Sequence, residues 1–409
     1  MGWNDTGLDL ATRDFVNLEL NLLRGVHTER VIFGPNGQWP AVNGSSAALT
    51  NCGLRMVIDV PEPTTRWRMG FQNFNQGNLV AANALTGKGI KVGRHVRTGG
   101  NRTGNFVASS AVSLVSSDFT IPGDGSYYLT SWFTDPTEQL DGEHILAVGY
   151  TQESSTAVIN SVGECWQWAT STSALDDTVT TSGTLRANTP LGWYIEYETF
   201  TARNQYLFLG DSIMEGITGL VGTSTSTIRG IPMGRTWPRR WADQMGCLAS
   251  VSAMAGFQAS VWNNALLDPY LWDRYNLATT DYKALIVHHG TNDINTGDSL
   301  ATLKASYVNM IEKAFTKMGK RVPLILVTLL PRTGFDATKN GIRRNFNAWL
   351  HELPLGAVAC MDPTLDFQLG TSLANQDSNA VSMYTDGIHP SYQGLESLRK
   401  LAATTIPLA

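Results

Sequence analysis

The sequence predicts an all-β domain followed by an α/β domain with a parallel sheet. The chain has 409 residues, more than an ordinary single domain, so two domains are expected. Between about residues 50 and 200, short segments rich in β-branched and aromatic residues alternate with clusters of Gly, Pro, Asn and Asp, as in a sandwich or jelly roll. Beyond residue 202, apolar strand-like segments alternate with helical patterns, which indicates a parallel sheet covered on both faces.

The all-β prediction covers residues 46–202, where no helical stripe of useful length appears. Its expected strands lie within residues 54–60, 65–74, 88–96, 105–121, 125–134, 143–151, 155–171 and 192–200. We treat residues 1–45 as a separate N-terminal segment, in which residues 11–26 could form a short helix that serves for docking.

The α/β prediction covers residues 203–409. The expected strands lie within residues 206–210, 248–256, 282–290, 322–331 and 356–363. The expected helices lie within residues 235–246, 298–321, 340–353 and 391–406. The longest helix has apolar residues three and four positions apart, Asp298 as its expected N-cap and Gly319 as its end.

Two Gly-Asp-Ser triplets occur, and their positions relative to the predicted elements distinguish them. The first ends at Ser212, just beyond an expected strand, and in parallel sheets sites lie beyond the carboxyl ends of the strands. The second ends at Ser299, at the start of a helix, where Asp-Ser is ordinary capping chemistry. Ser212 is therefore the candidate nucleophile, and Ser299 is interpreted as a capping residue.

A nucleophilic serine needs a histidine that removes its proton and a carboxylate that orients this histidine. Asp386 and His389 lie three residues apart in a loop before the last helix, so one turn can present both side chains. Asp141 and His144 have the same spacing, but they run directly into an expected strand, and we interpret them as a hairpin turn.

Acyl transfer also requires hydrogen-bond donors where negative charge develops on the carbonyl oxygen. Asn292 follows an expected strand within Gly-Thr-Asn-Asp, and its side-chain amide can donate. Gly256 ends another expected strand, where its N–H could point into the site. Taken singly, either residue could also be an ordinary turn residue.

Together these motifs resemble the SGNH (GDSL-type) hydrolase and esterase family over about residues 203–409. Its four blocks occur in the family's order, at residues 210–212, at Gly256, at residues 290–293 and at residues 386–390. The glycine block departs from the family pattern Asn-x-Gly-x-x-Gly, because only the central glycine is present.

The resemblance implies a flavodoxin-like, three-layer hydrolase domain that needs no cofactor. By resemblance, Ser212 is the nucleophile, His389 the general base and acid, and Asp386 the partner that orients the histidine. The oxyanion hole would consist of the backbone N–H groups of Ser212 and Gly256 together with the side chain of Asn292.

Several other classes of function are not expected. The net charge is −5 and no run of five basic residues occurs, which argues against nucleic-acid binding. The four cysteines are scattered without a CxxC pair, so buried thiols are expected rather than a metal site. His288 and His289 could face the site or bind metal, or they could be core residues; the chemistry needs no metal.

The sequence gives less information on location and assembly. No apolar run is long enough to span a bilayer and no signal peptide is recognised, so membrane insertion is not expected. The composition and the β-rich first part fit an extracellular or virion-associated protein, as in phage tail proteins, and a cytoplasmic enzyme is left open as an alternative. Homo-oligomerisation is left open.

The substrate is inferred from architecture. An aromatic-rich sandwich before such a hydrolase domain resembles some carbohydrate esterases and phage tail esterases, so an accessory, carbohydrate-binding-like role is expected for it. Five of its aromatic residues could stack on sugars or could simply be core: Trp132, Trp166, Trp168, Trp193 and Tyr197. Trp262 and Trp272, which follow the glycine block, could line the substrate site.

The function expected from the sequence is therefore removal of O-acyl groups, foremost O-acetyl groups, from a polysaccharide or glycan through an acyl-serine. A lipase-like or short-chain esterase is the alternative within this class. A non-catalytic glycan-binding or structural virion protein is the alternative from another class.

Overall fold

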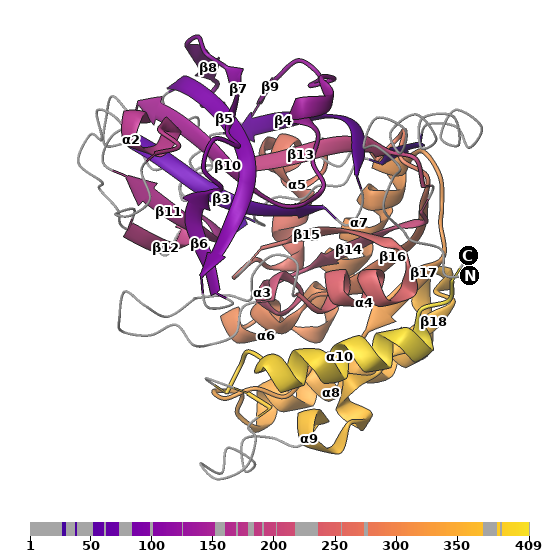
Figure 1. The fold of residues 1–409 in the computed structure, drawn as a ribbon. Coiled ribbons are helices and arrows are strands. Elements are labelled where there is room, and N and C mark those ends of the chain that lie inside the picture. Colours follow the sequence, from indigo (N-terminus) through magenta and orange to yellow (C-terminus); the bar gives the residue numbers. More distant parts are fainter. Residues whose placement is uncertain are drawn as a thin grey trace, which may run out of the picture.

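A computed structural model gives the arrangement of the chain (Figure 1). It describes residues 27–29, 37–38, 52–60, 63–72, 84–98, 101–124, 126–151, 160–168, 171–178, 184–189, 192–201, 203–216, 236–254, 256–273, 277–370, 383–384 and 387–408. The helix that residues 11–26 could form lies outside the described residues. Antiparallel sheets occupy one end of the molecule, and a parallel sheet with its helices occupies the other (Figure 1).

The first part of the chain forms two antiparallel sheets. Its strands are β1 (His27–Glu29), β2 (Gly37–Gln38), β3 (Cys52–Val60), β4 (Thr64–Gln72), β5 (Leu85–Thr98), β6 (Asn101–Phe106), β7 (Val112–Val115), β8 (Phe119–Ile121), β9 (Tyr127–Leu129), β10 (Gly142–Thr151), β11 (Asn160–Trp168), β12 (Thr184–Thr189) and β13 (Gly192–Thr199). One sheet has the order β1-β13-β4-β9. The other has the order β12-β11-β3-β10-β5-β6, with β2 beside β11 and with β7 and β8 beside β5. Two short helices, η1 (Pro136–Glu138) and α2 (Ser171–Leu175), connect strands.

The two antiparallel sheets enclose one apolar core, which confirms the predicted β-sandwich. Side chains alternate along each strand, so β3 sends Leu54 and Met56 into the same core as Trp67 and Met69 of β4. The opposite face of β3 carries Arg55, which is fully buried beneath α2.

Arg55 shows how the second face of the larger sheet is closed. Its guanidinium donates to the backbone carbonyls of Ala174 at 2.8 Å and Gly104 at 2.9 Å. Its charge also lies 4.7 Å from the ring centre of Phe106 and 4.6 Å from that of Trp168. Burial lowers the pKa of Arg55 to about 10. Arg55 therefore fastens α2 to the sheet.

The second part of the chain alternates strands with helices. Its strands are β14 (Gln205–Gly210), β15 (Leu248–Ala253), β16 (Tyr282–His288), β17 (Leu324–Val327) and β18 (Ala359–Met361). Its α-helices are α3 (Ser212–Glu215), α4 (Trp237–Met245), α5 (Asp268–Leu271), α6 (Thr291–Thr296), α7 (Leu300–Met318), α8 (Ala337–His351), α9 (Phe367–Gly370) and α10 (Tyr392–Thr405). The described residues of this part also form the 3-10 helices η3 (Ala259–Asn263), η4 (Ala265–Leu267), η6 (Pro354–Gly356) and η7 (Pro363–Leu365).

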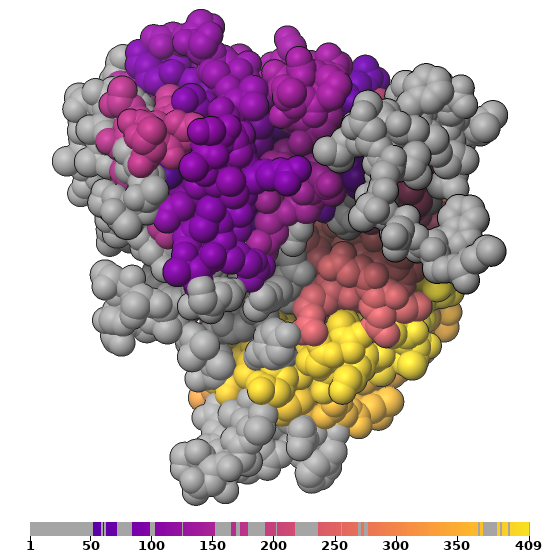
Figure 2. Space-filling view, in the orientation of Figure 1, coloured from indigo at the N-terminus to yellow at the C-terminus, as the bar shows by residue number. Residues whose placement is uncertain are grey.

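The five strands of this second part are parallel and have the order β15-β14-β16-β17-β18. This is the flavodoxin-like order 2-1-3-4-5. Alternate residues of β14 face opposite layers, because Tyr206 and Phe208 pack with α4 and α10 while Leu207 and Leu209 pack with α7 and α8. The predicted three-layer α/β domain is confirmed. Figure 2 shows α10 as a yellow band across the lower half of one face.

The two parts of the chain contact one another through buried side chains. Tyr194 of β13 is buried in the core of the α/β part, and its ring lies 5.2 Å from that of Tyr127. Conversely, Leu248 at the start of β15 belongs to the sandwich core.

Candidate active site

The carboxyl ends of β14 and β16 mark the point where the chain connections diverge. The connection from β14 to β15 contains α4, which packs on one face of the sheet. The connection from β15 to β16 contains η3, η4 and α5, whose apolar residues pack on the other face. In open parallel sheets this divergence leaves a crevice beyond the strand ends, where ligands bind.

Ser212 lies in the tight turn that follows β14. It is the first residue of α3, and Asp211 caps this helix by accepting the N–H of Ile213 on Oδ1 at 3.0 Å. The turn is compact because Gly210 has no side chain. A Cβ at Gly210 would lie 2.3 Å from the Cβ of Met214. The turn therefore fixes the Ser212 hydroxyl at the carboxyl end of β14.

His389 reaches the same point from the loop before α10. Its Nε2 lies 2.9 Å from the Oγ of Ser212, within hydrogen-bond distance. Thr333, in the loop between β17 and α8, donates its backbone N–H at 2.8 Å and its hydroxyl at 2.9 Å to the carbonyl oxygen of Gly387. These contacts hold the histidine loop against a neighbouring loop. Asp386 lies outside the described residues.

Gly256 and Asn292, which are expected to donate hydrogen bonds in the oxyanion hole, belong to neighbouring loops. Gly256 follows β15, is exposed and has a φ of 78°, a conformation that favours glycine. Asn292 lies in the first turn of α6, just beyond β16, and its Nδ2 donates to the carbonyl oxygen of Phe257 at 3.0 Å. An amide group carries two N–H bonds, so one remains for another acceptor after this contact.

The sequence of the second part of the chain matches a family of known proteins. Residues 208–396 match the model of the GDSL-like Lipase/Acylhydrolase family. The C-terminal half is a GDSL-like lipase/acylhydrolase domain. The chain therefore carries a hydrolase domain of the GDSL-like lipase/acylhydrolase type.

Solved structures resemble the chain at low sequence identity. A family two carbohydrate esterase from Clostridium thermocellum, an active-site mutant, is 13% identical, with 93% of this chain and 97% of that chain covered and a TM-score of 0.39. A family two carbohydrate esterase from Cellvibrio japonicus is 14% identical. The match covers 93% of this chain and 96% of that esterase, with a TM-score of 0.37. The lipase Lip_vut3 from a goat rumen metagenome is 18% identical. The match covers 49% of this chain and 96% of the lipase, with a TM-score of 0.37. No curated protein sequence matches the chain.

Trp262 and Trp272 do not line the site of the GDSL-like domain, so this expectation is wrong. Both indoles are completely buried. The Nε1 of Trp262 donates to the Nε2 of His289 at 2.8 Å, and the Nε1 of Trp272 donates to the carbonyl oxygen of Trp262 at 3.1 Å. The segment after the glycine block folds back over the sheet, which turns both rings inward.

The aromatic side chains of the sandwich are mostly core residues. Trp168, Trp193 and Tyr197 are buried. Trp132 is half-buried, with the guanidinium groups of Arg66 and Arg68 lying 4.4 and 4.6 Å from its ring centre. Trp166, also half-buried, packs so closely on the backbone of residue 104 that a Cβ there would lie 2.6 Å from the indole.

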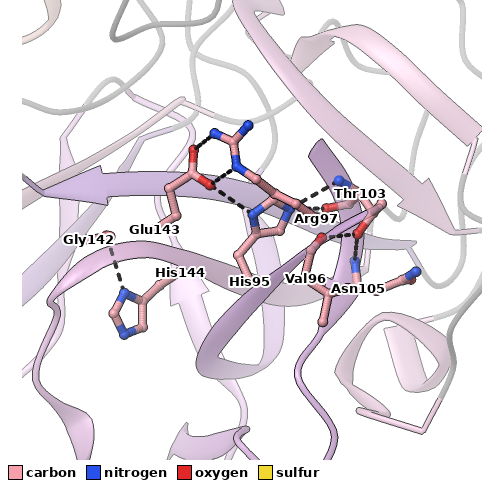
Figure 3. A network of polar contacts seen from close by, with 8 residues as sticks. All are labelled: His95, Val96, Arg97, Thr103, Asn105, Gly142, Glu143 and His144. Carbon is pink, nitrogen blue, oxygen red and sulfur yellow. Dashed lines mark hydrogen bonds and ion pairs between the residues drawn. The ribbon is translucent and has the colours of Figure 1, made fainter. Parts of the chain in front are cut away.

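The second Asp-x-x-His motif lies within the sandwich and not in the GDSL-like domain. His144 belongs to β10, where its Nδ1 lies 3.3 Å from the carbonyl oxygen of Gly142. Figure 3 shows this region, in which Glu143 contacts Arg97 and His95 while the ring of His144 turns away from them.

Ser299 caps α7, because its Oγ accepts the N–H of Thr302 at 3.1 Å. The expected N-cap, Asp298, lies one residue before the actual cap. Ser299 is exposed and makes its cap contacts within α7, as the sequence predicted for a capping serine.

The two adjacent histidines at the end of β16 are core residues. His288 and His289 are both buried, and burial lowers the pKa of His288. Within the described residues, no group of three or more His, Cys, Asp or Glu side chains could hold a metal ion. The described helices include none that is long and apolar enough to cross a membrane.

Proposed function

We propose that the protein is a carbohydrate O-acyl esterase, which removes acyl groups, foremost acetyl groups, from a polysaccharide through an acyl-serine intermediate. The contact of 2.9 Å between the Oγ of Ser212 and the Nε2 of His389 carries the catalytic part of this proposal. The carbohydrate part rests on architecture, since a β-sandwich before a hydrolase domain resembles some carbohydrate esterases and phage tail esterases.

The reaction begins when the Oγ of Ser212 attacks the acyl carbon and the Nε2 of His389 accepts the hydroxyl proton. The bond between the acyl carbon and the sugar oxygen then breaks, and His389 returns the proton to this oxygen. Water enters, loses a proton to His389 and attacks the acyl carbon. The bond between this carbon and the Oγ of Ser212 then breaks, His389 returns the proton to Oγ, and the carboxylic acid leaves. By family resemblance, Asp386 orients the imidazole throughout.

Each attack places a negative charge on the carbonyl oxygen. The proposed donors to this oxygen are the backbone N–H groups of Ser212 and Gly256 and the second N–H of the Asn292 amide. The contact of Asn292 with the carbonyl oxygen of Phe257 supports this role, because it fixes the amide plane before substrate binds.

Ester cleavage is tested first with 4-nitrophenyl acetate and 4-nitrophenyl octanoate. We expect rapid cleavage of the acetate ester, slow cleavage of the octanoate ester and loss of nearly all turnover in Ser212→Ala. Ser299→Ala is the matched control, because it removes the same hydroxyl from the other Gly-Asp-Ser triplet, and its turnover should equal that of the wild type.

The carbohydrate substrate is tested by measuring acetate released from acetylated polysaccharides. Preference for the octanoate ester would instead indicate a lipase-like enzyme. If Ser212→Ala and the wild type both fail on every ester, the non-catalytic glycan-binding or structural alternative replaces this proposal.

A further inference from the structure

We propose that Trp262, His289 and Asp293 are positioning residues that hold the two oxyanion-donor loops in register. The inference rests on the proposed function, because it takes Gly256 and Asn292 as the donors. None of the three side chains has measurable exposure to solvent, so they act through the loops and not on the substrate.

The contact between Trp262 and His289 defines the state of the imidazole. An indole N–H can only donate a hydrogen bond, so the Nε2 of His289, at 2.8 Å, must accept it. The proton of a neutral His289 is therefore on Nδ1. This atom lies 3.7 Å from the Oδ2 of Asp293, and both side chains are fully buried, so the N–H dipole lies beside a buried carboxylate.

Asp293 connects this pair to the glycine loop. Its Oδ1 accepts the backbone N–H of Ala259 at 2.9 Å, at the first residue of η3. Asp293 and Asn292 are adjacent in α6, and Asn292 donates to Phe257 in the same loop. Two neighbouring side chains of α6 thus hydrogen-bond to the backbone of Phe257 and Ala259, the residues on either side of Gln258. Gly256 directly precedes this segment.

Trp262 provides a second side-chain connection between the two loops, in addition to the contact of Asp293 with Ala259. Trp262 lies in η3, three residues after Ala259, and its indole donates to His289, two residues before the first residue of α6. Trp272 supports it from behind by donating to its carbonyl oxygen and by packing edge-on at 5.2 Å. Hydrogen bonds in such a buried environment are stronger than in water, so the loops hold their geometry before the oxyanion forms.

Trp262→Phe tests this connection by removing one N–H while keeping an aromatic ring. Loss of one buried hydrogen bond should lower kcat on 4-nitrophenyl acetate by about five- to tenfold and leave KM unchanged. The matched control is Trp241→Phe. Trp241 is also fully buried, but its Nε1 has no hydrogen-bond partner among the described residues, and kcat should stay near that of the wild type.

A double-mutant cycle with Asn292→Ala separates positioning from general destabilisation. If Trp262 acts by placing Asn292, Trp262→Phe should change kcat much less in the Asn292→Ala background than in the wild type. Equal losses in both backgrounds, or no loss in the wild type, would overturn the proposal. His289→Gln, which retains an acceptor for the indole, should keep more activity than His289→Leu.

A spectroscopic measurement tests the hydrogen bond between Trp262 and His289 independently of turnover. ¹⁵N NMR of the imidazole should show His289 with its proton on Nδ1 and with an unprotonated Nε2. A proton on Nε2 would overturn the inference. Failure of the wild type to cleave any ester would refute the proposed function instead, so the two failures are distinguishable.

Discussion

Replacement of Gly210 by alanine tests whether steric packing sets the position of the Ser212 hydroxyl. The new Cβ would lie 2.3 Å from the Cβ of Met214 and 2.8 Å from the carbonyl oxygen of His288. Both atoms are fixed close to backbone and cannot swing away. Ordinary contact begins at 3.4 Å, so Met214 and the new Cβ must separate by about 1.1 Å.

That displacement falls on α3, whose first residue is Ser212. A misplacement of about 1 Å can cost about 100-fold in rate, and overpacking costs about 1–3 kcal/mol of stability. We therefore expect Gly210→Ala to lower kcat on 4-nitrophenyl acetate about 100-fold and to lower the melting temperature.

Gly341→Ala is the matched control. Gly341 lies within α8, and a Cβ there meets no atom within 4 Å. Alanine favours the helix by about 0.5–1 kcal/mol, so the same substitution should raise the melting temperature and leave kcat unchanged. A Gly210→Ala enzyme with the wild-type kcat and melting temperature would refute the steric account.

Four further outcomes are expected. Thr333→Val should lower kcat about two- to tenfold with KM unchanged, because one hydrogen bond to the histidine loop is lost. Thr333→Ser should restore the rate. Equal activity of the wild type and both variants would contradict a role of Thr333 in holding this loop. Ser299→Ala should lower the free energy of unfolding by about 0.5–2 kcal/mol through loss of the cap, measured by urea denaturation, whereas a loss of turnover would contradict the capping role. Arg55→Met should lower the free energy of unfolding by about 3–5 kcal/mol, because buried carbonyls lose their donor; unchanged stability would show that α2 does not need it. Burial lowers the pKa of both His144 and His288, so below the unfolded-state pKa of about 6.5 the unfolded chain binds more protons than the folded one. The free energy of unfolding should therefore fall from pH 7 to pH 5, by up to about 1.4 kcal/mol per pH unit for each histidine, and His144→Gln should make the decline shallower.

Much of the second part could be predicted from the sequence, because strand ends are visible in it. Uninterrupted apolar runs identify buried parallel strands, and polar residues directly after such runs must gather at one edge of the sheet. This rule alone separates Ser212 from Ser299. It also places Asn292 and Gly256 at the same edge of the sheet as Ser212.

The direction of side chains in irregular segments could not be predicted. Trp262 and Trp272 lie in a stretch of 3-10 and short helical turns with neither period 2 nor period 3.6, so no pattern indicates which way a ring points. Asp298 and Ser299 are both good capping residues, and only the backbone conformation decides between them. A charged residue in an alternating strand is expected to face water, and Arg55 is buried only because a distant helix covers it.

The exchange of Tyr194 and Leu248 between the two cores limits how this protein can change during evolution. A recombination event that joined the hydrolase domain to another sandwich would remove the Tyr194 ring and leave a void in the catalytic core. The same event would expose Leu248 to whatever surface the new partner supplied. We therefore expect that a stable exchange of the sandwich would require compensating substitutions in the α/β part, so the two parts do not behave as interchangeable modules.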